Sequence, residues 1–266
     1  MKAILGVFLV FLLGLGAENA LAQINDINSA INKAGRQRML SQRMAKAYFQ
    51  IGQGVDIERS KKILDTSVAT FDRQLVELKN YAPTPDIKNT YLSLEKTWLS
   101  YKDVLIGKAP SPDNGRKVLA LSEEVLALAQ QGTVQLEKQS TSAAGQLVNV
   151  SGRQRMLSQR MAKFYFYRTW ELYEAPADME MHLSRAHFTS VLKQLENSGH
   201  AAPAARAAAT RLRRAWEPYQ QALFASKEPA AMRAGAERVA EGSERVLAAC
   251  EEVVALLVAQ AQGRPT

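Results

Sequence analysis

The chain has 266 residues, enough for one or two domains, and its 34 Lys and Arg against 26 Asp and Glu give a net charge of +8. A single cysteine, Cys250, excludes an internal disulfide, so a packed core must stabilise the fold. The positive charge favours an anionic partner, which would be a lipid surface, a nucleic acid or a small anion.

The first residues have the features of a secretory signal. Lys2 precedes a short apolar run from Ala3 to Gly16, and Ala20-Leu21-Ala22 is a small-x-small cleavage site. The alternative is an uncleaved membrane anchor, which needs about 20 apolar residues. We therefore expect residues 1–22 to be a cleaved signal peptide and the mature protein to be a soluble periplasmic one. Export makes nucleic acid the least expected of the anionic partners.

The rest of the chain has helical rather than strand periodicity. Proline and glycine positions predict helices over about 25–51, 56–80 and 86–106, and a fourth helix from about 114. In the second half they predict a helix that ends near 175–177, followed by helices over about 178–197, 203–226 and 229–262, with a kink at Pro218. No proline lies between Pro112 and Pro176, so the fourth helix is free to continue into the second half as one long helix.

Four helices in each half predict an all-α fold of two tandem antiparallel four-helix bundles, with one long continuous helix between them as an option. The expected domains are a signal peptide over 1–22, a first bundle over 23–135 and a second bundle over 136–266. Apolar positions correspond between the halves and are expected to form the two cores: Phe71, Leu75 and Leu78 match Phe188, Leu192 and Leu195, and Trp98 and Tyr101 match Trp216 and Tyr219.

One segment of twelve residues occurs twice without a change. It runs from Gly35 to Lys46 and again from Gly152 to Lys163, and the match extends outward to Asn32 and Asn149. Packing alone would preserve apolar character at helical spacing and let the polar residues vary. We therefore interpret the segment as a functional surface that is used twice.

On a helix the repeated segment forms three stripes. An apolar stripe is expected to face the bundle core, and it contains Leu40, Met44, Ala47 and Ile51. A mostly basic stripe contains Arg36, Met39, Arg43 and Lys46, with Arg153, Met156, Arg160 and Lys163 in the second copy. The third stripe mixes apolar and small residues with Arg38 and Gln42, and with Arg155 and Gln159 in the second copy.

The third stripe carries the candidate site. Gly35, one turn before Arg38, would let another backbone approach closely, and an arginine held at such an approach must be paired. No acidic residue lies between Asn32 and Val55, so the partner is a carboxylate from elsewhere or an anion from solution. A guanidinium binds a flat oxyanion through two parallel N–H groups, and Ser41 and Gln42 could add neutral donors. The alternative is a structural ion pair, with the acidic candidates Glu58, Glu77, Glu123 and Glu124.

The segment resembles the P-box of the nitrate/nitrite sensor kinases NarX and NarQ, and more closely the N-terminal domain of PilJ-type chemotaxis transducers. That family has a Gly-x-x-Arg-Met-x-Ser-x-Arg pattern, which here spans residues 35–43 and 152–160. The resemblance implies a periplasmic four-helix bundle in which Arg38 and Arg155 bind nitrate or nitrite at a subunit interface. It also implies that Gly35, Gly152, Met39 and Met156 shape the helix approach, next to Ser41, Ser158, Gln42 and Gln159.

We therefore expect a signalling protein that is not an enzyme and that uses no cofactor or metal. His182 and His187 do not have the spacing of a helical metal pair. Two motif copies must meet around a ligand, either in a homodimer or by the two halves folding side by side, and a membrane-bound transducer would be the partner. The alternative is a helical docking module without a small ligand, whose basic stripe binds an acidic protein or a membrane surface.

Overall fold

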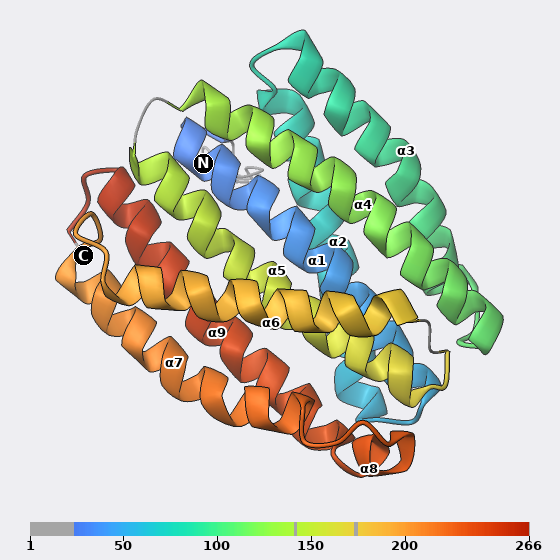
Figure 1. The fold of residues 1–266 in the computed structure, drawn as a ribbon. Coiled ribbons are helices and arrows are strands. Elements are labelled where there is room, and N and C mark those ends of the chain that lie inside the picture. The colour runs from blue at the N-terminus through green and yellow to red at the C-terminus, as the bar shows by residue number, and fades with distance from the viewer. Residues whose placement is uncertain (1–23, 141–142, 173–174, 266) are drawn as a thin grey trace, which may run out of the picture.

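The computed structural model describes residues 24–140, 143–172 and 175–265, in which every regular element is a helix (Figure 1). The helices are α1 (Ile27–Gly52), α2 (Ile57–Tyr81), α3 (Pro85–Gly107), α4 (Pro112–Gln139), α5 (Ala143–Thr169), α6 (Ala175–Glu196), α7 (Pro203–Leu223), α8 (Pro229–Ala234) and α9 (Ala236–Ala261). The signal peptide predicted over residues 1–22 lies outside the described residues.

The helices form two four-helix bundles that lie side by side. In the first bundle α1 packs on α2 and α4, and α3 joins these two; in the second α5 packs on α6 and α9, and α7 joins these two. The most extensive packing between the bundles is between α1 and α5, which Figure 1 shows next to each other in the centre of the molecule. The prediction of an all-α fold with tandem helical repeats is confirmed.

The two bundle cores repeat each other in detail. Phe71 packs on Trp98 with ring centroids 4.2 Å apart, and Phe188 packs on Trp216 at the same 4.2 Å. All ten residues predicted as matching core positions are buried. The core therefore follows the apolar spacing seen in the sequence.

The long continuous helix left open by the sequence does not form. Helix α4 ends at Gln139, where Ser140 has an extended backbone with φ −90° and ψ 120°, and α5 begins at Ala143. The Ser-Thr-Ser segment has low helix propensity because short hydroxyl side chains compete for backbone hydrogen bonds. The chain folds back at this point, so that the second bundle packs beside the first instead of extending away from it (Figure 1).

Three other predicted boundaries need correction. Helix α5 ends at Thr169. Helix α6 begins at Ala175, before the predicted start, because proline in the first turn of a helix needs no partner for an N–H group and Pro176 fits there. Helix α7 ends at Leu223 rather than near 226. The predicted last helix is divided at Gly235 into α8 and α9.

Helices α1 and α5, here called the motif helices, run in the same direction and in register. Near their starts, Arg38 donates to the side-chain oxygen of Asn149 at 2.8 Å, and Arg155 donates to the backbone oxygen of Asn32 at 3.1 Å. At their far ends, Gln53 donates to Phe166 O at 2.8 Å. We call this α1–α5 interface the seam.

Ion pairs cross between the bundles on both sides of the seam. Lys46 of α1 binds Glu244 of α9 at 2.6 Å, and Arg43 binds the same carboxylate. In the same way Lys163 of α5 binds Glu123 of α4. Both lysines are fully buried. Each motif helix therefore takes its counterion from the last helix of the opposite bundle.

Loss of one crossed carboxylate is expected to destabilise the whole chain. In Glu244→Gln the buried Lys46 loses its counterion, which should lower the free energy of unfolding by about 3–5 kcal/mol. Urea denaturation followed by circular dichroism measures this. Glu241→Gln, which removes a surface pair with Arg245, is the control and should change little. Equal effects of the two substitutions would contradict the assignment.

The same carboxylates predict how stability depends on pH. Burial raises the pKa of Glu123 and Glu244, but the neighbouring Lys and Arg outweigh burial and lower each pKa from 4.5 to about 2. A lowered carboxyl pKa stabilises the fold above the unfolded value and loses this effect as the pH falls through the folded value. The melting temperature should therefore drop between pH 4.5 and about 2. The drop should be shallower in the Glu123→Gln/Glu244→Gln double variant, and an identical drop would refute this origin.

Candidate functional site

The arginines of the two motif copies face each other across the seam. Arg38 is 1% exposed and Arg155 is 0% exposed. An added Cβ at Gly35 would lie 3.1 Å from Nη2 of Arg38 and 3.3 Å from Nη2 of Arg155. A Cβ at Gly152 would lie 3.3 Å from Arg155 Nη2 and 3.8 Å from Arg38 Nη2. The two guanidinium groups, here called the arginine pair, therefore meet between the two glycines.

Among the described residues, Arg38 forms hydrogen bonds to neutral groups only. Its Nη1 donates to Gln130 Oε1 at 2.6 Å, and its Nη2 donates to Asn149 Oδ1 at 2.8 Å. Its Nε has no hydrogen-bond partner in the described part of the chain, and no carboxylate there forms an ion pair with it. A buried guanidinium without a counterion is costly, so this position favours a bound anion.

Arg155 has a carboxylate partner. Its Nη1 donates to Glu251 Oε2 at 2.9 Å, and its Nη2 donates to the backbone oxygen of Asn32 at 3.1 Å. Its Nε, like that of Arg38, has no partner among the described residues. Glu251 also accepts a hydrogen bond from Arg36 at 2.7 Å. One arginine of the pair is thus compensated within the chain.

The electrostatic environment follows from this arrangement. Burial lowers the pKa of Arg38, and the nearby charges of Arg153 and Arg155 lower it further. Glu137 opposes these shifts, and the resulting pKa is about 9. Burial also lowers the pKa of Arg155, although Glu251 opposes this shift. A pKa of about 9 leaves Arg38 protonated at neutral pH, so the arginine pair carries two positive charges.

The glycines make room for side chains rather than for a bare backbone. The sequence predicted that Gly35 lets a second backbone approach, whereas the atoms closest to it are the two Nη2 groups. Met39 and Met156 are buried along the same helices, 3% and 5% exposed. The motif thus allows two charged side chains to share the space between α1 and α5.

The serines and glutamines of the motif bond within the chain. Ser41 and Ser158 donate to the backbone oxygens of Arg38 and Arg155, and fix the start of each following turn. Gln42 donates to Ser122 O at 3.1 Å, and its counterpart Gln159 donates to Ser243 O at 2.9 Å. The two glutamines therefore join each motif helix to the last helix of its own bundle.

The basic stripe is not the exposed docking face that the sequence left open. The stripe residues other than the methionines are Arg36, Arg43, Lys46, Arg153, Arg160 and Lys163. Lys46 and Lys163 are fully buried in the crossed pairs, while Arg160 is 8% exposed and bound to Glu123 at 2.7 Å. Only Arg153 of this stripe is classed as exposed. Carboxylates distant in the sequence cover most of the stripe, and the sequence alone does not show which helices bring them there.

A surface cavity of about 330 Å³ lies between α1 and α9. Its lining includes Arg36, Arg43, Glu244 and Glu251. One residue of its lining, Glu251, also binds the buried Arg155.

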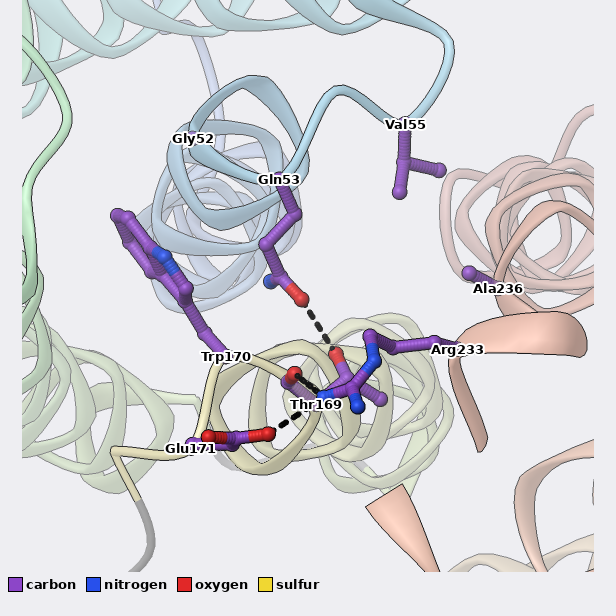
Figure 2. Close-up of a pocket in the computed structure, with 8 residues that line it drawn as sticks. All are labelled: Gly52, Gln53, Val55, Thr169, Trp170, Glu171, Arg233 and Ala236. Atoms are coloured by element: carbon purple, nitrogen blue, oxygen red, sulfur yellow. Dashed lines mark hydrogen bonds and ion pairs between the residues drawn. The ribbon is translucent and has the colours of Figure 1, made fainter. Parts of the chain in front are cut away.

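A second cavity, of about 420 Å³, lies at the far ends of the motif helices (Figure 2). Gln53 accepts a hydrogen bond from Thr169 at 2.8 Å, and Arg233 donates to Glu171 at 2.8 Å. The last two side chains are 48% and 67% exposed, so water screens a pair that is already neutral. This cavity offers no charge that calls for a ligand.

Within the described residues no helix is both long and apolar enough to span a membrane. The same residues contain no cluster of three or more His, Cys, Asp or Glu side chains suited to a metal ion. Cys250 is buried and its thiol pKa is raised by burial, which disfavours the reactive thiolate.

A family model matches the chain twice, over residues 20–130 and 136–241. It describes the N-terminal region of type IV pili methyl-accepting chemotaxis transducers, PilJ. The chain belongs to this family. No curated protein and no solved structure matched it. The two PilJ copies correspond to the two bundles, so the resemblance seen in the sequence is confirmed and the chain carries a tandem pair of sensory domains.

Several residues that contact the arginine pair were not identified as site residues from the sequence. Asn32 and Asn149 belong to the extended match and could have been included on that signal. Gln130 and Glu251 lie 92 and 96 residues from the arginines that they bind. Each lies eight residues after the serine of a shared Ser-Glu-x-Val-Leu-Ala pattern, at 122–127 and 243–248, which aligns the two positions. Such contacts become visible only when the helices are packed.

The glycines of the site can be tested through stability. Gly35→Leu should lower the free energy of unfolding by about 1–3 kcal/mol, because the new side chain meets both guanidinium groups. Gly199→Leu is the control, since a Cβ there would meet nothing within 4 Å. Chemical denaturation compares the two. Unchanged stability in Gly35→Leu would mean that the arginines are not held as described.

Proposed function

We propose that this chain is a periplasmic sensor protein that binds a small oxyanion, of the nitrate or nitrite type, at the arginine pair. The observation that carries the proposal is Arg38, a buried guanidinium that faces a second guanidinium and has no carboxylate partner among the described residues. A bound anion would relieve both the cost of burying this charge and the repulsion between the pair.

The chemistry of the pair suits a flat oxyanion. Two guanidinium groups present N–H donors from opposite sides, and an oxyanion with several oxygens accepts from both. Both motif helices belong to one chain, so a single protein supplies both arginines. A homodimer is then not needed to form the site, although the chain can still assemble with itself.

Signalling would proceed through the packing of α1 against α5. An anion that joins two like-charged helices favours their close state, and the equilibrium shifts by the difference in affinity between the states. Each motif helix is also tied to α4 and α9 by the crossed pairs, so a shift at the seam reaches both bundles. The family assignment supports a membrane-bound transducer as the partner that receives this change.

The periplasmic location is part of the proposal and derives from the predicted signal peptide over 1–22. A fusion of residues 1–22 to alkaline phosphatase should give activity only if the segment directs export. Loss of the positive charge at Lys2 and of the apolar run should abolish that activity.

Calorimetric titration with nitrate and nitrite tests the site. Wild-type protein should bind one of these anions, and its melting temperature should rise with anion concentration. Arg38→Met should lose the binding while staying folded, because an apolar side chain of similar length replaces an uncompensated charge. Arg155→Met should lose it as well.

Arg116→Ala is the control for these variants, since Arg116 is a surface arginine whose side chain is 52% exposed. It should bind like the wild type. Absence of heat with every anion, together with an unchanged melting temperature, would refute the proposed function.

A further inference from the structure

The buried arginines of the two bundles have hydrogen-bond acceptors of different charge. Arg155 Nη1 donates to a carboxylate, Glu251 Oε2, at 2.9 Å. Arg38 Nη1 donates to an amide, Gln130 Oε1, at 2.6 Å. The same guanidinium nitrogen thus binds a charged acceptor in one bundle and a neutral acceptor in the other.

Gln130 and Glu251 occupy the same structural position. Gln42 binds the backbone of Ser122 on α4, and its counterpart Gln159 binds the backbone of Ser243 on α9. Counting from these two serines, Gln130 and Glu251 are each eight residues further along the helix. The only chemical difference at this position is the one between an amide and a carboxylate.

This difference sets the net charge around the arginine pair. Arg155 and Glu251 cancel each other, whereas Arg38 keeps its charge. Glu251 also binds Arg36, but these two side chains are 30% and 34% exposed, so water screens that contact.

On the Arg38 side, Glu137 opposes the lowering of the Arg38 pKa through its charge, but its hydrogen-bond link to Arg38 runs through Asn149. Asn149 accepts from Arg38 at 2.8 Å and donates to Glu137 at 2.6 Å. A carboxylate that is one side chain away does not replace a direct ion pair. One positive charge therefore remains in the buried part of the site.

We propose that the Gln130/Glu251 difference determines which ligand the site accepts, namely one singly charged anion per chain. This inference rests on the proposed function and specifies its ligand class. One negative charge neutralises the site, while a doubly charged anion or a second anion would bury an excess negative charge, which costs several kcal/mol. Gln130 and Glu251 are thus specificity-determining residues.

Three variants add, remove or relocate the carboxylate and leave both arginines unchanged. Gln130→Glu gives Arg38 its own counterion, so nitrate affinity should fall at least about tenfold, equivalent to about 1.4 kcal/mol. Glu251→Gln leaves two uncompensated charges, so sulfate should bind at least about tenfold more tightly than in the wild type. The exchange variant Gln130→Glu/Glu251→Gln retains one carboxylate at the opposite arginine. It should prefer nitrate over sulfate as the wild type does.

The experiment is calorimetric titration of the wild type and the three variants with nitrate and with sulfate at matched ionic strength, alongside their melting temperatures without added anion. Without anion, Gln130→Glu should melt higher than the wild type because Arg38 gains a counterion, and Glu251→Gln should melt lower. The exchange variant is decisive, since two merely disruptive substitutions would not restore wild-type selectivity.

The outcomes separate this inference from the proposed function. If the wild type binds nitrate and sulfate equally, and Arg38→Met loses both, the proposed function stands. The inference that the site accepts one singly charged anion, here called the charge rule, is then overturned. Nitrate binding that survives Gln130→Glu also overturns the rule. If the wild type binds no anion, the proposed function fails and the ligand class fails with it. A higher melting temperature of Gln130→Glu would then support only the unequal compensation of the two arginines.

Discussion

The fold depends on how positive charge is compensated where α1 and α5 meet. Each motif helix brings arginines and a lysine into a buried interface, and none of the motif residues is acidic. The carboxylates that pair with the two lysines come from α4 and α9, and these crossed pairs, Lys46–Glu244 and Lys163–Glu123, tie each motif helix to the opposite bundle. Separate bundles would leave these lysines unpaired, so the side-by-side packing is a consequence of charge as well as of apolar contact.

The exact repetition of twelve residues follows from the same interface. Because α1 and α5 run parallel and in register, the glycines and arginines on the seam face of one copy lie near those of the other. The repeated serines and glutamines make matching contacts in the two halves: Ser41 and Ser158 bind the preceding turn, and Gln42 and Gln159 bind the last helix of their own bundle. A substitution in one copy would break a contact that has little room to adjust.

The sequence was sufficient to predict the helical class, the two repeats and the core, because apolar spacing and proline positions are local signals. It also predicted that Arg38 and Arg155 lie at a close approach of helices and need a partner there. It did not lead to Gln130 or Glu251, since their contacts span more than 90 residues and depend on helix packing. The long helix was wrongly left open because the absence of proline permits a helix without requiring one, and Ser140 ends α4 through its weak helix propensity.

The covalent link between the two PilJ copies has a consequence for symmetry. In a homodimer of single copies, a residue on the two-fold interface appears twice, so its charge enters the central site an even number of times. Here the two halves are encoded separately, and glutamine can occupy one side while glutamate occupies the other. Duplication within one chain therefore gives access to odd net charges at the centre, which identical subunits cannot produce with these same residues.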